Sequence, residues 1–295
     1  MTALPRLPDA EMYQRLYKTR PLSMGVPRLL LTSGLLPLLL ALGVIRIFFF
    51  CLFNAVYLAL PARAWRRFTR REWLYRLILF LTVGIVFRTP GFHAGAGRRQ
   101  RLVVMNHHGV QDIFLFHFIE QVGVSRLVVS YPPAFYAWAR RWFFFFDHDF
   151  EIVSAAQRRK IFSAGADDVT MVFPEGAGKK GPFVLAFQPA VFRIHAQVDP
   201  FAVSYSSALG LLDTYGVDLP WHKTVCFVLM IITPWTVVTV QQLPPVRTDR
   251  DHPQDTANRC RQMIAAAAGY QMVDLLFDQR AFDACVGQPQ TCAEP

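Results

Sequence analysis

Two chemically capable side chains lie close together in the segment VVMNHHGVQDIFLF. An apolar run ends at Asn106, and His107 and Asp112 follow with four residues between them. A histidine at a strand end can be held by a nearby carboxylate through one ring nitrogen while the other accepts a proton from a hydroxyl. The spacing therefore indicates a general-base pair. The alternative is an aspartate that caps a helix beside exposed histidines, because isolated pairs of this spacing often arise by chance.

A second segment, VTMVFPEGAGKKGPF, has the composition of a phosphate-binding loop. Glu175 and Gly176 follow a β-rich run, Pro174 restricts the turn, and later glycines free the backbone. Such a loop can present amides and the ammonium groups of Lys179 and Lys180 to a phosphate. Alternatively, both lysines belong to a solvated loop that binds no phosphate.

Together the two segments resemble the glycerolipid acyltransferase family of the lysophosphatidic acid acyltransferase type, whose members carry N-H-x4-D followed by F-P-E-G. The matching residues are Asn106, His107, Asp112, Phe173, Pro174, Glu175 and Gly176. A later segment, Val198–Tyr205, resembles another apolar block of the family. Two motifs in order are far more specific than either alone.

The resemblance implies an α/β fold, a mixed sheet with flanking helices, and transfer of a fatty acyl group from acyl-CoA to a lysophospholipid or glycerol-phosphate hydroxyl. His107 would be the base and Asp112 its orienting partner. The residues that would bind the acceptor are Glu175, Gly176, Lys179 and Lys180. No metal or bound cofactor is implied, since acyl-CoA is a co-substrate. The expected partners are membrane lipid, acyl-CoA and the lysophospholipid acceptor.

The sequence departs from the family pattern at two places. Gly109 stands where a serine is usual, and Ala177-Gly178 stands where threonine and arginine are usual. We therefore expect Lys179 or Lys180 to take the place of the missing arginine at the acceptor phosphate. The changed acceptor motif favours a rival hypothesis, a non-catalytic scaffold with an acyltransferase-like domain. The intact His107–Asp112 pair favours the enzyme.

Three features resemble a lipid-droplet branch of the family. They are an apolar N-terminal stretch followed by WRRFTRR, the segment YPPAFYAWAR and the segment PWTVVTVQQLPPV. Members of that branch continue into a ubiquitin-binding domain, and the resemblance supplies no ubiquitin site here. It implies the endoplasmic reticulum membrane or a lipid droplet as the location, with the domain facing the cytosol.

Composition indicates a membrane partner. Of 295 residues, 53% are hydrophobic and only 18% are charged. About half of the basic residues but few of the acidic ones lie in residues 1–101, so the net charge of +10 belongs to the N-terminal third. These basic residues flank the most apolar stretch and no zinc-finger or RNP signature is present, which favours a membrane surface over nucleic acid.

The run from Leu29 to Leu60 is too apolar for a soluble helix, since Arg46 is its only charged residue. As one straight helix it would be about 48 Å long, beyond the roughly 30 Å of a hydrocarbon core. Basic residues flank both ends, which keeps both ends cytosolic. We predict a membrane-embedded hairpin over residues 29–61, bent between Pro37 and Gly43. A cleaved signal peptide is the weaker alternative.

The other predicted parts are a basic segment over residues 1–28, an amphipathic interfacial helix within 62–89, an acyltransferase-like domain over 90–270 and a tail over 271–295. The helix expected from Glu72 to Phe87 either lies at the membrane interface or belongs to the core. The predicted strands are Leu102–Met105, Leu127–Ser130, Val169–Phe173, Phe201–Tyr205 and Val237–Val240. The predicted helices among them are Asp112–Gln121, Ala155–Ala164 and Asp255–Ala268. This alternation predicts an α/β domain.

The remaining candidates are weak. The five cysteines form no CxxC pattern, and we interpret them as reduced thiols. His148 stands between two aspartates, but no second ligand cluster has a helpful spacing, so we expect a polar loop and assign no metal.

Overall fold

The computed structural model of the chain describes residues 26–69, 71–89, 101–108, 110–129, 133–144, 147–154, 168–176, 182–193, 196–208, 230–249 and 251–276. Several predicted features lie outside these described residues. They are Lys179, Lys180, the helix expected over Ala155–Ala164, the N-terminal segment up to residue 25 and the tail from residue 277.

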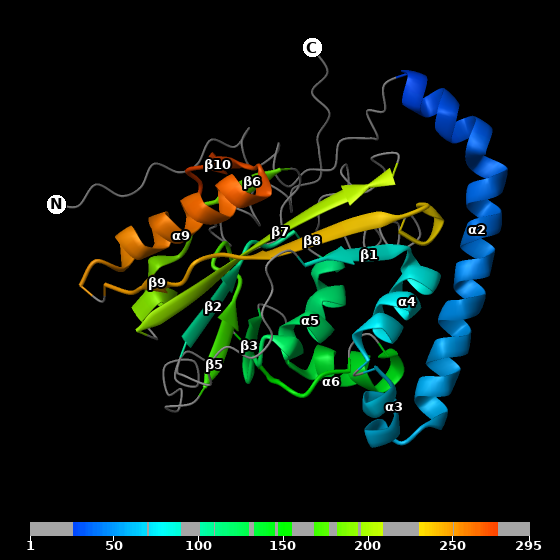
Figure 1. The fold of residues 1–295 in the computed structure, drawn as a ribbon, viewed down its shortest axis with the longest axis horizontal. Helices are drawn as coiled ribbons and strands as arrows, with labels where there is room; N and C mark the ends of the chain where they lie inside the picture. Colours follow the sequence, from blue (N-terminus) through cyan, green and yellow to red (C-terminus); the bar gives the residue numbers. More distant parts are fainter. Residues whose placement is uncertain are drawn as a thin grey trace, which may run out of the picture.

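An eight-stranded mixed sheet forms the centre of the domain (Figure 1). Its strands are β1 (Ile85–Arg88), β2 (Arg101–Met105), β3 (Arg126–Val129), β4 (Glu151–Ser154), β5 (Val169–Val172), β7 (Gln197–Ser207), β8 (Thr236–Gln242) and β9 (Val246–Arg247). The order is β1-β8-β7-β2-β5-β3-β4, with β9 paired to β7. Within the described residues, β7 runs antiparallel to β8 and β9, and the other pairs are parallel. The predicted α/β fold with a mixed sheet is confirmed.

Helices cover both faces of this sheet. They are α2 (Val26–Ala59), α3 (Ala62–Thr69), α4 (Glu72–Val83), α5 (Phe116–Gln121), α6 (Pro133–Trp142), α9 (Pro253–Ala268) and the 3-10 turns η1 (Val110–Leu115) and η3 (Pro189–Arg193). In Figure 1, α4 and α5 lie on one face and α9 on the other, next to a small parallel sheet of β6 (Phe183–Leu185) and β10 (Gln271–Val273).

Strand β2 lies between two apolar cores. Val103 and Met105 pack into the core on the α4 and α5 side, whereas Leu102 and Val104 pack into the core beneath α9. Side chains alternate across a strand, so a parallel strand that is buried on both faces reads as an unbroken apolar run. This is why the sequence of β2 predicts a strand so clearly, and why its carboxyl end is held firmly.

The predicted hairpin over residues 29–61 is wrong. Helix α2 runs unbroken from Val26 to Ala59 with Pro37 inside it, and Figure 1 shows it as one bowed rod along the side of the domain. A proline in a long helix removes one backbone donor, which gentle bending can accommodate. Gly43 is a close-packing position rather than a bend, because a Cβ there would lie 3.0 Å from Ile232 Cγ2.

The helix predicted through Phe87 is shorter than expected. Helix α4 ends at Val83 because Gly84 adopts a left-handed φ of 71° and caps the helix, and Ile85–Arg88 then forms β1 beside β8. The core alternative is confirmed for one face of this helix, and its place at a membrane interface stays a prediction. Tyr75, Ile78, Leu79 and Val83 face the core, and Trp73, Leu77 and Phe80 are exposed.

Candidate functional site

The structure brings His107 and Asp112 into contact at the carboxyl end of β2. His107 lies two residues beyond the strand, and Asp112 lies in the first turn of η1. Nδ1 of His107 is 2.5 Å from Oδ2 of Asp112. The aspartate is buried, whereas the side chain of His107 is 25% exposed. The carboxylate therefore holds one ring nitrogen while the imidazole remains partly open to solvent.

The Asp112 carboxylate accepts hydrogen bonds from two further donors. The backbone N–H of His108 donates to Oδ2 at 2.8 Å, and the hydroxyl of Tyr205 donates to Oδ1 at 2.6 Å. Burial by itself raises the pKa of Asp112, but hydrogen bonds from His107 and Tyr205 and the charges of both histidines outweigh it and lower the pKa to about 2. Asp112 is therefore ionised at neutral pH and favours the His107 tautomer with its proton on Nδ1, which leaves Nε2 as the basic nitrogen.

Asn106 anchors the end of β2 to β7. Its Oδ1 accepts the N–H of Val203 at 2.7 Å, and its Nδ2 donates to the carbonyl of the same residue at 2.8 Å. The same Nδ2 lies 2.9 Å from Nε2 of His108. An amide side chain supplies both a donor and an acceptor, so it can extend the β2–β7 ladder beyond the last strand residue. The sequence matched Asn106 to a motif without indicating this role.

Both carboxylate oxygens of Glu175 accept hydrogen bonds from the backbone. It is fully buried, and its Oε1 accepts the N–H of His107 at 2.9 Å while Oε2 accepts the N–H of Leu185 at 2.7 Å. The acceptor-binding role that the sequence suggested for Glu175 stays a prediction. The neighbouring Gly176 has a φ of 83°, a left-handed conformation that glycine adopts most readily. Lys179 and Lys180 lie outside the described residues.

Aromatic rings surround the two histidines. The Phe173 ring centre is 4.6 Å from that of His107, and the Tyr205 ring meets His108 edge-on at 4.8 Å. Sequence reasoning missed Tyr205 as a partner of Asp112. The available signal was strand alternation, because Phe201, Val203 and Tyr205 share the face of β7 that looks toward the α5 side of β2.

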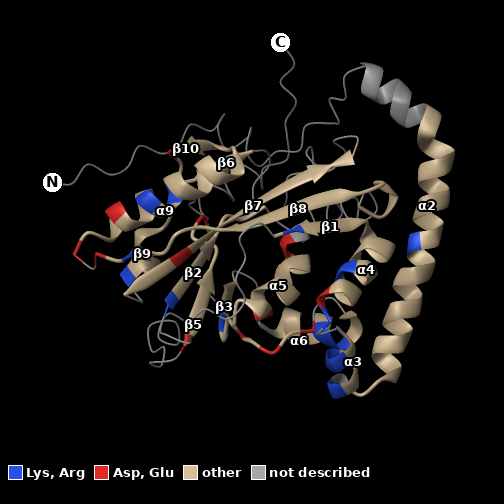
Figure 2. Ribbon diagram, viewed as in Figure 1, with Lys and Arg blue, Asp and Glu red and all other residues tan. Residues whose placement is uncertain are grey.

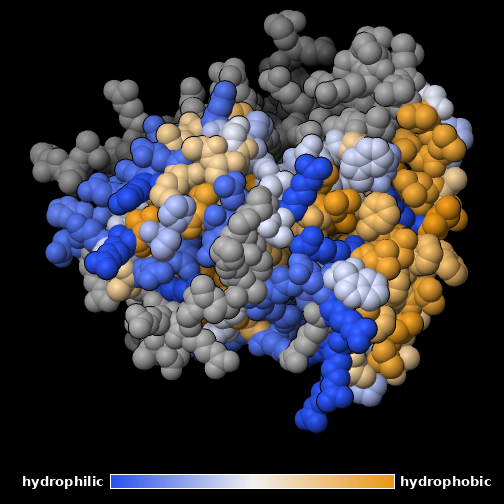
Figure 3. Space-filling model, viewed as in Figure 1, coloured by the Kyte–Doolittle hydropathy of each residue, from blue (hydrophilic) through white to orange (hydrophobic). Residues whose placement is uncertain are grey.

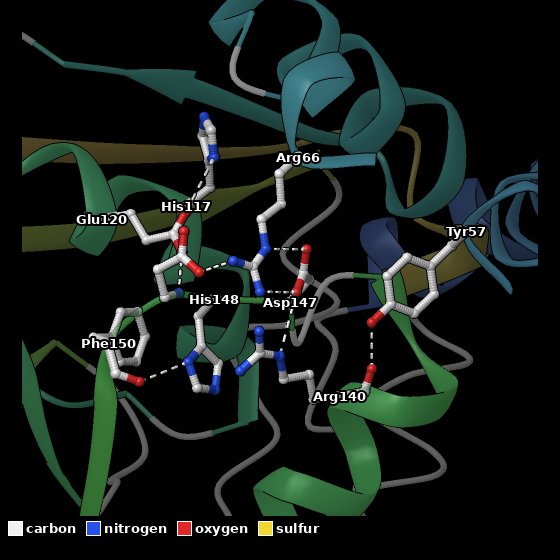
Figure 4. Close-up of polar contacts among 9 residues, drawn as sticks. Tyr57, Arg66, His117, Glu120, Arg140, Asp147, His148 and Phe150 are labelled. Atoms are coloured by element: carbon white, nitrogen blue, oxygen red, sulfur yellow. Dashed lines mark hydrogen bonds and ion pairs between the residues drawn. The ribbon is translucent and has the colours of Figure 1, made fainter. Parts of the chain in front are cut away.

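His148 lies in a polar loop before β4, as predicted, and its side chain is buried in a separate network (Figure 4). Its Nδ1–H donates to the carbonyl of Phe150 at 2.9 Å, and the two rings stack at 4.3 Å. Next to it, Asp147 accepts from Arg66 at 3.4 Å and from Arg140 at 3.3 Å, which ties α3 to α6. Among the described residues, no group of three His, Cys, Asp or Glu side chains is arranged to hold a metal.

No protein-family model and no curated protein matches the sequence. Three chains of solved structure match. One is the 1-acyl-sn-glycerophosphate (LPA) acyltransferase PlsC from Thermotoga maritima, with a TM-score of 0.41 and 17% sequence identity, over 76% of this chain and 96% of that chain. A likeness at this distance leaves the function to be argued from the site itself.

Proposed function

We propose that this chain is a membrane-bound acyltransferase that moves a fatty acyl group from acyl-CoA to the hydroxyl of a lysophospholipid or glycerol phosphate. The observation that carries this proposal is the contact between His107 and an ionised, buried Asp112 at the carboxyl end of a central parallel strand. In open α/β sheets, ligands bind outside the carboxyl ends of the strands.

The reaction requires one proton carrier. Nε2 of His107 accepts the proton of the acceptor hydroxyl as its oxygen bonds to the thioester carbonyl carbon. The carbon–sulfur bond then breaks, the electron pair leaves with the coenzyme A thiolate, and the imidazolium returns the proton to that sulfur. Asp112 stabilises the imidazolium through Nδ1, and Glu175 holds the histidine backbone in place. We propose that the acceptor phosphate lies beside the segment after Gly176, near Lys179 or Lys180.

The apolar outer face of α2 supports a membrane location. Length and composition alone would allow residues Gly34–Ala59 to cross a membrane. The large side chains exposed on this helix, here called the apolar ridge, are Leu36, Leu38, Leu40, Val44, Ile45, Ile47, Phe48, Leu52 and Leu58. In Figure 3 the hydrophobic surface is concentrated along the side that carries α2, whereas the side that carries α9 is mostly hydrophilic. A soluble surface rarely exposes so large a continuous apolar patch.

The packing of α2 favours a helix that lies along the membrane surface. Its inner face contacts the domain from Gly43, where a Cβ would lie 3.0 Å from Ile232 Cγ2, to Tyr57, whose hydroxyl donates to the carbonyl of Arg140. These two positions are about 21 Å apart along the helix. A helix bound to the domain over that length lies at the same depth as the domain, so the ridge faces lipid while α2 does not cross. Figure 2 shows basic residues gathered on the adjoining α3, a suitable position for lipid headgroups.

Arg46 supports the same orientation. A lone charge in an apolar helix is costly in lipid unless it is paired. Arg46 is only 3% exposed, and its guanidinium donates to the carbonyls of Ile231, Thr233 and Pro234. Gly84 makes room for it, because a Cβ there would lie 2.5 Å from Nη2 of Arg46. The charge therefore faces the domain and leaves the ridge apolar.

The rival function is a non-catalytic scaffold on a lipid droplet or the endoplasmic reticulum. Its sequence support is the likeness of YPPAFYAWAR and PWTVVTVQQLPPV to ancient ubiquitous protein 1, a lipid-droplet protein with an acyltransferase-like domain. The structural observation that favours it is Glu175, whose two carboxylate oxygens accept backbone hydrogen bonds from His107 and Leu185 within the fold.

One assay separates the two functions. The purified full chain in detergent or lipid nanodiscs is incubated with radiolabelled acyl-CoA and a panel of lysophospholipids and glycerol phosphate, beside the His107→Ala variant. We expect labelled product from the wild type and a large loss in the variant. Transfer that the substitution leaves unchanged overturns the mechanism, and no transfer to any acceptor favours the scaffold.

A further inference from the structure

We infer that Tyr205 is a positioning residue of the transfer site, which holds the Asp112 carboxylate in the orientation that pairs with His107. This inference rests on the proposed function and deepens it. The hydroxyl of Tyr205 donates to Oδ1 of Asp112 at 2.6 Å, while Oδ2 of the same carboxylate lies 2.5 Å from Nδ1 of His107. A residue that acts through Asp112 in this way needs no contact with substrate.

The carboxylate needs an anchor from outside its own segment. Its Oδ2 accepts from the Nδ1 of His107 and the backbone N–H of His108, and both donors lie within five residues of Asp112. Two donors on one oxygen leave the carboxyl plane able to rotate about that oxygen. A third donor on Oδ1 fixes the plane, and Tyr205 supplies it from a different element, β7.

Strand β7 is a rigid support for this anchor. Tyr205 pairs with Val238 in the antiparallel ladder between β7 and β8. Two residues earlier on the same face, Val203 holds Asn106 through both its N–H and its carbonyl. Successive inward positions of β7 therefore hold both ends of the segment from Asn106 to Asp112, one through the main chain and one through a side chain.

Electrostatics keep the tyrosine a donor. Burial first, and then the negative charge of Asp112, raises the pKa of Tyr205 well above its ordinary value. Its hydroxyl therefore stays protonated at any ordinary assay pH. The titratable groups that face this carboxylate and hydroxyl include His107, His108 and Tyr270, and Glu175 adjoins them through the His107 backbone. In such a buried site, removal of the Tyr205 hydroxyl takes one hydrogen bond away from an ionised carboxylate.

The first arm of the test uses kinetics. Tyr205→Phe keeps the ring that packs on His108 and removes only the hydroxyl. Tyr57→Phe is the matched control, because it also removes a hydroxyl that donates a partly buried hydrogen bond. The acceptor there is the carbonyl of Arg140, in the separate network of Figure 4. We expect Tyr205→Phe to lower kcat about tenfold with KM for both substrates unchanged. An unchanged kcat, or an equal loss in Tyr57→Phe, overturns the inference.

The second arm does not depend on activity. The Nδ1 proton of His107 is followed by NMR in full-length protein with labelled histidine, and His107→Gln assigns its resonance. We expect Tyr205→Phe to shift or broaden this resonance and Tyr57→Phe to leave it in place. A resonance unchanged in Tyr205→Phe overturns the positioning role. If the wild type transfers no acyl group yet the resonance responds, the proposed function fails while the structural role of Tyr205 stands.

Discussion

Oε1 of Glu175 accepts the backbone N–H of His107 at 2.9 Å, so the two motifs of the candidate site meet through the main chain of the histidine. Strand β5, which precedes Glu175, runs parallel to β2 with Val172 opposite Val104. The carboxyl ends of both strands therefore reach the same edge of the sheet. The second oxygen of Glu175 continues the link to Leu185 in β6. A carboxylate is suited to this position because it accepts two amides at once.

Replacement of Glu175 should primarily lower stability. Glu175→Gln turns one acceptor oxygen into a donor that faces a backbone N–H, and Glu175→Ala removes both acceptors. We expect each to lower the free energy of unfolding by about 1–3 kcal/mol, the cost of unmet buried amides. Thermal unfolding in detergent measures this. A raised KM for the acceptor with unchanged stability would instead support direct contact between Glu175 and the acceptor.

Asp112→Asn should lower turnover without unfolding the domain. A positioned general base contributes roughly 10²- to 10⁴-fold to rate and needs its orienting partner. The amide cannot stabilise the imidazolium as the ionised carboxylate does. Turnover near the wild-type value would mean that His107 works alone. His108→Ala is the internal control, and its inactivity beside an active His107→Ala would identify His108 as the base.

Lys179 and Lys180 should act on acceptor affinity. They follow Glu175-Gly176, where the resembling family offers an arginine, and a lysine supplies a point charge in its place. Replacement of both by glutamine should raise KM for a phosphate-bearing acceptor more than it lowers the maximal rate. Steady-state kinetics with acceptors of different phosphate charge measures this split. An unchanged KM would return both lysines to the interpretation as a solvated loop.

The free energy of unfolding should decrease as the pH is lowered from 6.5 to 4, because His148 is buried in its neutral form. Burial, followed by the charge of Arg140, lowers the pKa of His148 from 6.5 to about 4. The folded state therefore binds fewer protons than the unfolded state in this range. The contribution of His148 to the free energy of unfolding is fully present above pH 6.5 and decreases as the pH falls, by about 2 kcal/mol at pH 5. Unfolding midpoints at pH 7 and pH 5 measure the loss, which should shrink in His148→Gln.

His117 should also make the protein less stable as the pH is lowered. Burial lowers its pKa to about 4, and its ring stacks on Tyr75 at 4.2 Å. The double variant His117→Gln, His148→Gln should therefore show a flatter stability profile than either single variant. Equal pH dependence in the wild type and the double variant would assign the acid sensitivity to other groups.

Residues on both sides of α2 should share the cytosolic side. Because α2 is fastened to the domain along its inner face, its two ends cannot lie on opposite sides of a bilayer while the domain stays in water. In intact microsomes, an impermeant label or a protease should reach tags at both termini without detergent. Protection of the N-terminal tag alone would mean that α2 crosses the membrane.

The local part of the site could be predicted from the sequence. His107 and Asp112 are five positions apart at a strand-to-helix junction, and backbone geometry alone brings such neighbours within reach. Strands β2 and β5 could also be predicted, because they are buried on both faces and appear as unbroken apolar runs, whereas β1 and β4 were not predicted. Helix α9 could be predicted from the spacing of its apolar residues and from the glycine that caps it.

Only the tertiary structure decided the long-range partners. Asp112 meets Tyr205, and His107 meets Glu175, because β7 and β5 are the two neighbours of β2. The order of strands depends on pairing between segments far apart in the sequence, which no local pattern encodes. The same holds for α2. Pro37 and Gly43 are ordinary signs of a break, but Arg46 finds its carbonyl acceptors in residues 231–234, and this contact with a distant segment helps to hold one continuous helix against the domain.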